Sequence, residues 1–189
     1  MEYVAIGCGV TQAVVFTVAV AGKARGVRAF HAFARSLVEA RLVRRGWRTG
    51  AAACVILVEA AVVPLLATPG SAALGFAVAA TLCAVLTGAV TLTLLRRIPA
   101  SCLCFGARPS RMGWPHAVRN AILAAVAGLG YATATAAGAA GATGAHPVRA
   151  AGVAVAVCAG AVGALLLIRF DDLAHIFHPA DSLDRSVLR

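Results

Sequence analysis

The sequence predicts an all-α, polytopic membrane protein: a bundle of about five transmembrane helices, with an interfacial amphipathic helix after the first. Of its 189 residues, 61% are apolar, and the mean hydropathy is +0.88. Several apolar runs are long enough to cross a hydrocarbon core of about 30 Å. These runs fill residues 1–170, so we expect a single transmembrane helical domain there and a polar cytoplasmic tail at 171–189.

The net charge is +10, from 17 Lys and Arg against 7 Asp and Glu. In a soluble protein this balance would suggest a nucleic-acid partner, but here the basic residues collect in the gaps between apolar runs. That pattern is typical of membrane topology and of contact with anionic lipids. We therefore expect membrane lipids as partners and no nucleic acid.

The first span covers residues 3–22 and lacks the basic n-region of a signal peptide, so we expect it to be retained. The next gap contains an amphipathic segment, Val27–Val43, with apolar and charged residues on opposite sides of a helix. This predicts a helix on the membrane surface, although an ordinary solvated helix fits the short apolar stripe equally well. The apolar positions are Phe30, Phe33, Leu37 and Val38.

Two further spans, 50–67 and 72–95, are predicted on either side of the turn Thr68-Pro69-Gly70-Ser71. The fourth span covers 115–140, with Pro115 in its first turn and Trp114 at interfacial depth. The fifth covers 147–168.

The basic residues also predict the orientation. Between the spans they number eight, none, five and one, with three more in the tail. By the positive-inside rule, the N-terminus is extracytoplasmic, the first and third gaps are cytoplasmic and the C-terminus is cytoplasmic. We expect a multi-pass protein of the plasma (inner) membrane.

The third gap, residues 96–120, holds the only close pair of cysteines, Cys102 and Cys104. A cysteine reacts as its thiolate, and nearby cations lower the pKa of the thiol. Two cysteines one residue apart can close a strained, easily reduced disulfide, which suits exchange. The neighbouring cations are Arg96, Arg97, Arg108 and Arg111.

A copper site and a chance placement are also compatible with this pair. Cys102, Cys104, Met112 and His116 offer soft ligands for Cu(I), but their spacing matches no strong metal template. Chance placement is compatible because the apolar chain is rich in cysteine. The tail contains Asp and His residues that we leave without a metal role, so no metal site is predicted.

Glu59 is the only charge within residues 51–95. If its helix starts near Gly50, Glu59 lies about 13 Å into the membrane. An ionisable group at that depth indicates function by default, with Arg119, Asn120 or Lys23 as its candidate partner. The alternative is a carboxyl group that locks helix packing.

The run Pro99-Ala100-Ser101-Cys102-Leu103-Cys104-Phe105-Gly106, with Arg119-Asn120 beyond it, resembles the MauE-type family of methylamine utilisation membrane proteins, which is related to DoxX-like proteins. Gly22-Lys23, the Phe-containing segment and Glu59 also resemble the family pattern, over roughly residues 10 to 135. Two features differ: Ala100 and Ser101 separate the proline from Cys102, and the charge count puts the pair on the cytoplasmic side.

The resemblance implies maturation of a periplasmic, disulfide-rich dehydrogenase subunit, with Cys102 and Cys104 as the redox pair. Phe105 and Gly106 would shape the turn beside them, and Arg119, Asn120, Glu59 and Lys23 would support the site. The protein would then be a membrane thiol-disulfide oxidoreductase with a thioredoxin-like or client protein as partner. Its cofactor is undetermined: none, or a quinone.

Two further classes of function are compatible with the sequence. One is a non-enzymatic membrane subunit that binds and stabilises partner proteins. The other is a small transporter or lipid-binding protein that uses Glu59.

Overall fold

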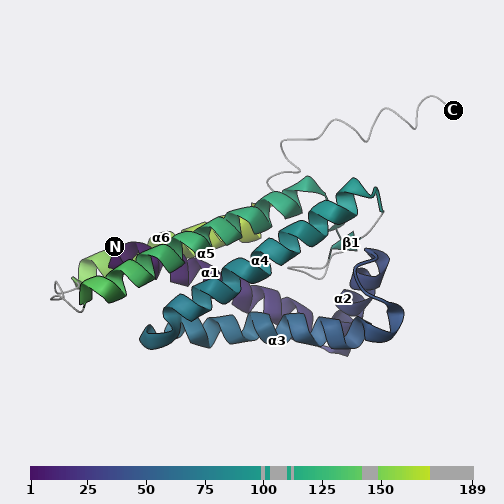
Figure 1. Cartoon of the computed structure of the whole chain (residues 1–189), viewed down its shortest axis with the longest axis horizontal. Coiled ribbons are helices and arrows are strands. Elements are labelled where there is room, and N and C mark those ends of the chain that lie inside the picture. The colour runs from purple at the N-terminus through teal and green to yellow at the C-terminus, as the bar shows by residue number, and fades with distance from the viewer. Residues whose placement is uncertain (99–100, 103–109, 112, 142–148, 171–189) are drawn as a thin grey trace, which may run out of the picture.

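The computed structural model describes the chain except for residues 99–100, 103–109, 112, 142–148 and 171–189. The regular secondary structure of the described part is helical apart from one two-residue ladder (Figure 1). The long helices are α1 (Glu2–Ala24), α3 (Arg48–Ala67), α4 (Ala72–Leu95), α5 (Trp114–Gly141) and α6 (Ala150–Ile168). The shorter elements are α2 (Val27–Glu39), η1 (Arg45–Trp47), η2 (Pro69–Ser71), β1 (Ser101–Cys102) and β2 (Ser110–Arg111).

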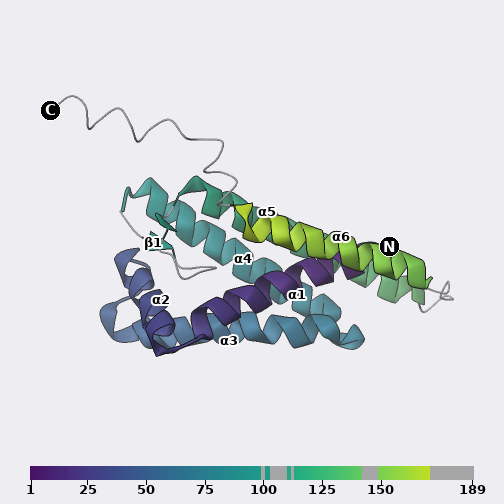
Figure 2. The same cartoon turned by 180° about the vertical axis from the view of Figure 1, so that it is seen from behind.

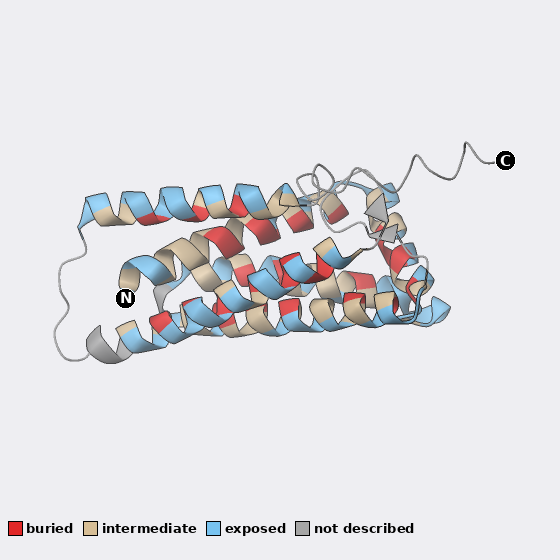
Figure 3. Ribbon diagram, turned by 90° about the horizontal axis from the view of Figure 1, so that it is seen from above, coloured by how far each residue is buried: buried red, intermediate tan, exposed pale blue. Residues whose placement is uncertain are grey.

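Five of these helices are long and apolar enough to cross a membrane, as the sequence predicts. They are α1, α3, α4, α5 and α6. Their outward faces carry large apolar side chains that a soluble protein would bury, and Figure 3 shows buried residues on their inner faces. This distribution is expected when hydrocarbon is the solvent, because lipid tails are as apolar as leucine.

Helix α1 lies at the centre of the arrangement and contacts α3, α5 and α6, while α4 packs along α5 (Figure 2). The main apolar core forms where these helices meet, and it includes Val15, Phe16, Val62, Cys83 and Leu123. The predicted hairpin between the second and third spans forms at η2. There Ser71 Oγ donates to the Leu65 carbonyl at 2.9 Å.

Small residues let α1 and α6 approach closely. A Cβ added at Gly160 would lie 2.5 Å from the carbonyl oxygen of Gly7, and Thr11 Oγ1 donates to the Gly160 carbonyl at 3.0 Å. The two helices run in the same direction, because Tyr3 lies against Gly152 and Thr11 against Gly163. Close approach of this kind is how helices associate in a membrane.

The amphipathic helix α2 ends at Glu39, earlier than the predicted Val43. Arg41 adopts a left-handed φ of 55°, its N–H donates to the Val38 carbonyl, and the Leu42 N–H donates to the Leu37 carbonyl. This is a Schellman motif, which ends a helix and brings an apolar residue back onto its last turn. The predicted end at Val43 was wrong, because the apolar spacing continues beyond Arg41, where the backbone leaves the helical conformation.

Candidate functional site

A buried ion pair joins α1 to α3. Lys23 Nζ donates to Glu59 Oε1, and the two side chains are only 3% and 2% exposed. Lys23 lies in the last turn of α1, whereas Glu59 lies about 16 Å along α3 from Arg48. Lys23, one of the three predicted partners, thus binds the carboxylate directly, as a charge in a membrane requires.

Helix α2 covers this ion pair. The Lys23 ammonium lies 4.8 Å from the centroid of the Phe33 ring, which is within the range of a cation–π contact. Phe33 also packs with Ala34 and Ala52 in a second small apolar core between α2 and α3. The position of α2 is therefore tied to the ion pair.

Helix α5 brings the other predicted polar residues into the bundle. Arg119 is 1% exposed, and Asn120 and His116 are each 5% exposed. Cys83 of α4, itself 1% exposed, lies within electrostatic range of Arg119, Glu59 and Lys23. Charged groups from three helices thus lie within electrostatic range of one buried thiol, which the sequence did not predict.

Two buried oxygens have no hydrogen-bond partner among the described residues. One is Glu59 Oε2 and the other is Gln12 Oε1. Gln12 Nε2 donates to the Leu123 carbonyl at 2.7 Å and so links α1 to α5. Gln12 was not predicted from the sequence, although a lone amide in an apolar run is a signal that could have found it.

The ladder of β1 and β2, which contains Cys102 and which we call the cysteine hairpin, lies at the same end of the bundle as α2. Cys102 pairs with Ser110 in the antiparallel ladder of β1 and β2, and β1 contacts α2. Cys104, Phe105 and Gly106 lie outside the described residues, as does Met112 of the alternative copper site. The described residues contain no group of three or more His, Cys, Asp or Glu arranged to hold a metal.

Exposed arginines gather at the end of the bundle that holds α2, which we call the basic end. Of the eleven exposed arginines in the described ranges, ten lie here and one, Arg149, lies at the opposite end. The ten come from the ends of α1, α3, α4 and α6, from α2 and from the segment after it: Arg25, Arg28, Arg35, Arg41, Arg44, Arg45, Arg48, Arg96, Arg97 and Arg169.

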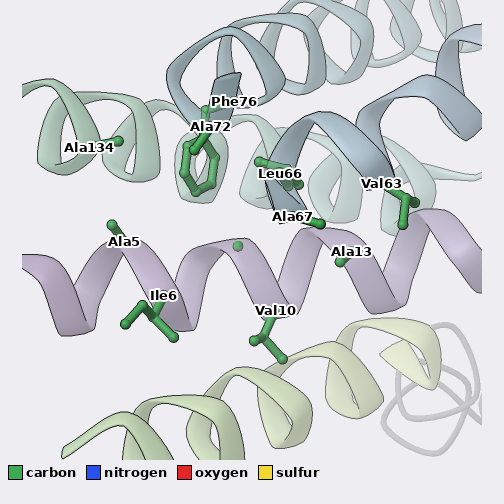
Figure 4. A pocket seen from close by; sticks show the side chains of 11 residues that line it. Ala5, Ile6, Val10, Ala13, Val63, Leu66, Ala67, Ala72, Phe76 and Ala134 are labelled. Atoms are coloured by element: carbon green, nitrogen blue, oxygen red, sulfur yellow. The ribbon is translucent and has the colours of Figure 1, made fainter. Parts of the chain in front are cut away.

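An apolar cavity of about 410 Å³ lies toward the opposite end, between α1, α3, α4 and α5 (Figure 4). Glycine and hydrocarbon side chains alone line it, including Ala5, Val10, Leu66 and Phe76. Phe76 packs so closely on α5 that a Cβ at Gly130 would lie 2.3 Å from its ring. This cavity offers no group for acid–base or thiol chemistry.

Comparison with known proteins identifies a family. Residues 1–133 match the family model described as "Methylamine utilisation protein MauE". This range runs from α1 into α5, as far as Thr133. No curated protein and no solved structure matches the chain. The matched range includes the ion pair and the cysteine hairpin.

Proposed function

Because the chain belongs to the MauE family, we propose that it takes part in thiol-disulfide exchange through Cys102 and Cys104 during maturation of a partner protein. The observation that carries the proposal is the place of Cys102 in the ladder with Ser110. In that ladder the backbone of Cys102 lies outside the five long helices, and β1 contacts α2 at the arginine-rich end.

The exchange conserves atoms and electrons. In the reducing direction, the thiols of Cys102 and Cys104 lose two electrons and two protons and form a disulfide, while a partner's disulfide gains them and becomes two thiols. A thioredoxin-like protein restores the dithiol by the same step. Arginines close to the pair in sequence, such as Arg96 and Arg97, would favour the attacking thiolate.

The ion pair supports this chemistry without taking part in it. Lys23 binds Glu59, Phe33 of α2 covers the ammonium, and α2 contacts β1. These contacts connect the helix bundle to the backbone of Cys102. We therefore assign Lys23 and Glu59 as positioning residues, with Arg119 and Asn120, both buried on α5, as further supporting residues.

The basic end faces the cytoplasm in this proposal, since basic residues are retained on that side. A reporter fused after Arg45 should behave as cytoplasmic, and one at Gly70 as extracytoplasmic. The opposite pattern would place the cysteine pair on the same side as a periplasmic client and would overturn the orientation.

A non-enzymatic role in stabilising partner proteins is the second candidate. It is favoured by the burial of Glu59 in an ion pair, because such a pair can serve packing alone. In that case both cysteines would be dispensable.

Trapping of a mixed disulfide tests the choice. In Cys102→Ser or Cys104→Ser, the remaining thiol cannot close the intramolecular bridge, so one of the two variants should accumulate a covalent adduct with a thioredoxin-like or client protein. The adduct should disappear on reduction. Cys54→Ser, a change in α3 outside the hairpin, is the matched control and should trap nothing. The non-enzymatic role would be favoured if neither hairpin variant traps an adduct and if the variant with both Cys102→Ser and Cys104→Ser still supports maturation of the partner protein.

A further inference from the structure

A second cavity, of about 510 Å³, lies at the basic end between the end of α1, the start of α2 and α3. Ala24 and Gly26 line it where the chain leaves α1, Val27 and Phe30 line it from α2, and Ala53 and Leu57 line it from α3. Its volume is within the range of about 300–1,000 Å³ that is typical of ligand sites. Figure 2 shows the three helices that form it.

The surface of this groove is apolar and faces outward from the bundle. Val27 is 73% exposed and Leu57 is 69% exposed, so both sides of the groove present bare hydrocarbon. Leu57 belongs to a membrane-spanning helix. A hydrocarbon chain from the bilayer therefore matches the groove in polarity.

Two exposed arginines, Arg25 and Arg28, are neighbours in sequence of residues that line the groove. Arg25 stands between the lining residues Ala24 and Gly26, and Arg28 follows Val27. The neighbouring Lys23 is already bound to Glu59, so Arg25 and Arg28 are the exposed basic residues next in sequence to the lining. The cavity at the opposite end has no basic residue next to any residue that lines it. Of these two cavities, therefore, only the one at the basic end combines an apolar lining with exposed arginines next to it in sequence.

We propose that this groove binds one anionic phospholipid, with an acyl chain against Phe30 and Leu57 and the phosphate near Arg25 and Arg28. Both parts of the ligand have a chemical counterpart: hydrocarbon for the chain and guanidinium groups for the phosphate. The site is separate from the cysteine pair and does not depend on the thiol-exchange proposal. It fixes α2 to the membrane at the point where the chain turns out of α1.

Native mass spectrometry of the full-length protein, titrated in detergent with phosphatidylglycerol or phosphatidylcholine, tests this site. Wild type should bind one phosphatidylglycerol in preference to phosphatidylcholine. Arg25→Gln with Arg28→Gln should weaken that binding about 30-fold, the equivalent of about 2 kcal/mol. The matched control, Arg44→Gln with Arg45→Gln, removes the same charge from exposed positions that are not next in sequence to any lining residue, and it should leave binding nearly unchanged.

A second variant tests the groove itself. Ala53→Phe adds volume to the lining and keeps every charge, so it should lower binding of phosphatidylglycerol while far-ultraviolet circular dichroism stays that of wild type. Equal binding of the two lipids, or equal losses in the two arginine pairs, would overturn the proposal in favour of a diffuse charge effect. Full binding by Ala53→Phe would overturn the placement of the chain.

Discussion

The buried ion pair should dominate the stability of the contact between α1 and α3. Lys23→Met removes the cation and leaves Glu59 without its partner at 2% exposure. Glu59→Gln does the reverse, since it leaves the ammonium without a carboxylate. Breaking a buried pair by removing one partner costs about 3–5 kcal/mol, because a charge remains in a medium of low polarity. We expect each single variant to lose about that much.

The double variant Lys23→Met/Glu59→Leu should recover most of this loss. It leaves no charge behind, and replacement of a buried pair by apolar residues of similar size is often neutral or stabilising. The double-mutant cycle should therefore show a large coupling energy between the two positions.

Unfolding in mixed micelles with increasing SDS, followed by circular dichroism, measures these free energies. Arg35→Met is the matched control for Lys23→Met, because Arg35 is an exposed cation on α2, and it should change the unfolding free energy by less than about 1 kcal/mol. Single variants as stable as the control would show that the pair contributes nothing. A double variant whose loss equals the sum of the single losses would show that the two charges do not compensate one another.

Two further predictions concern helix packing and helix ends, and thermal unfolding in detergent checks both. Gly160→Ala should lose about 1–3 kcal/mol, because its Cβ would lie 2.5 Å from a backbone oxygen of α1. Gly163→Ala should lose nothing, since its Cβ would meet Thr11 Oγ1 at 3.6 Å; equal effects would refute the close contact. Arg97→Gly should raise stability by about 1 kcal/mol, because φ is 53° there. Arg96→Gly should lower stability by about 0.5–1 kcal/mol, because φ is −77° at Arg96 and glycine gains nothing there. A gain in stability at both positions would contradict the left-handed conformation of Arg97 as the cause.

The long helices could be predicted because their signal is local. A run of about 20 apolar residues has few alternatives to a membrane-spanning helix. The turn at Thr68 to Ser71 could be predicted for the same reason, since proline and glycine interrupt such a run. The end of α2 could not, because it depends on the left-handed conformation of Arg41, a residue without a strong preference for it.

The candidate site was only partly predictable. Glu59 is conspicuous in its span, and its need for a partner follows from burial alone, but the choice of Lys23 among three candidates depends on how α1 crosses α3. The approach of Cys83 to the charged residues and the link from Gln12 to α5 also arise from packing. No pattern within one helix encodes such contacts.

The accessibility of the cysteine pair tests the central claim most directly. In inverted membrane vesicles, the measurement is the fraction of Cys102 and Cys104 that reacts with a membrane-impermeant maleimide, after reduction and again after mild oxidation. We predict that both thiols are labelled after reduction and protected after oxidation, and that Cys102→Ser abolishes the protection. Cys83, at 1% exposure, should remain unlabelled throughout. Equal labelling of the pair in both states would contradict thiol-disulfide exchange at this hairpin.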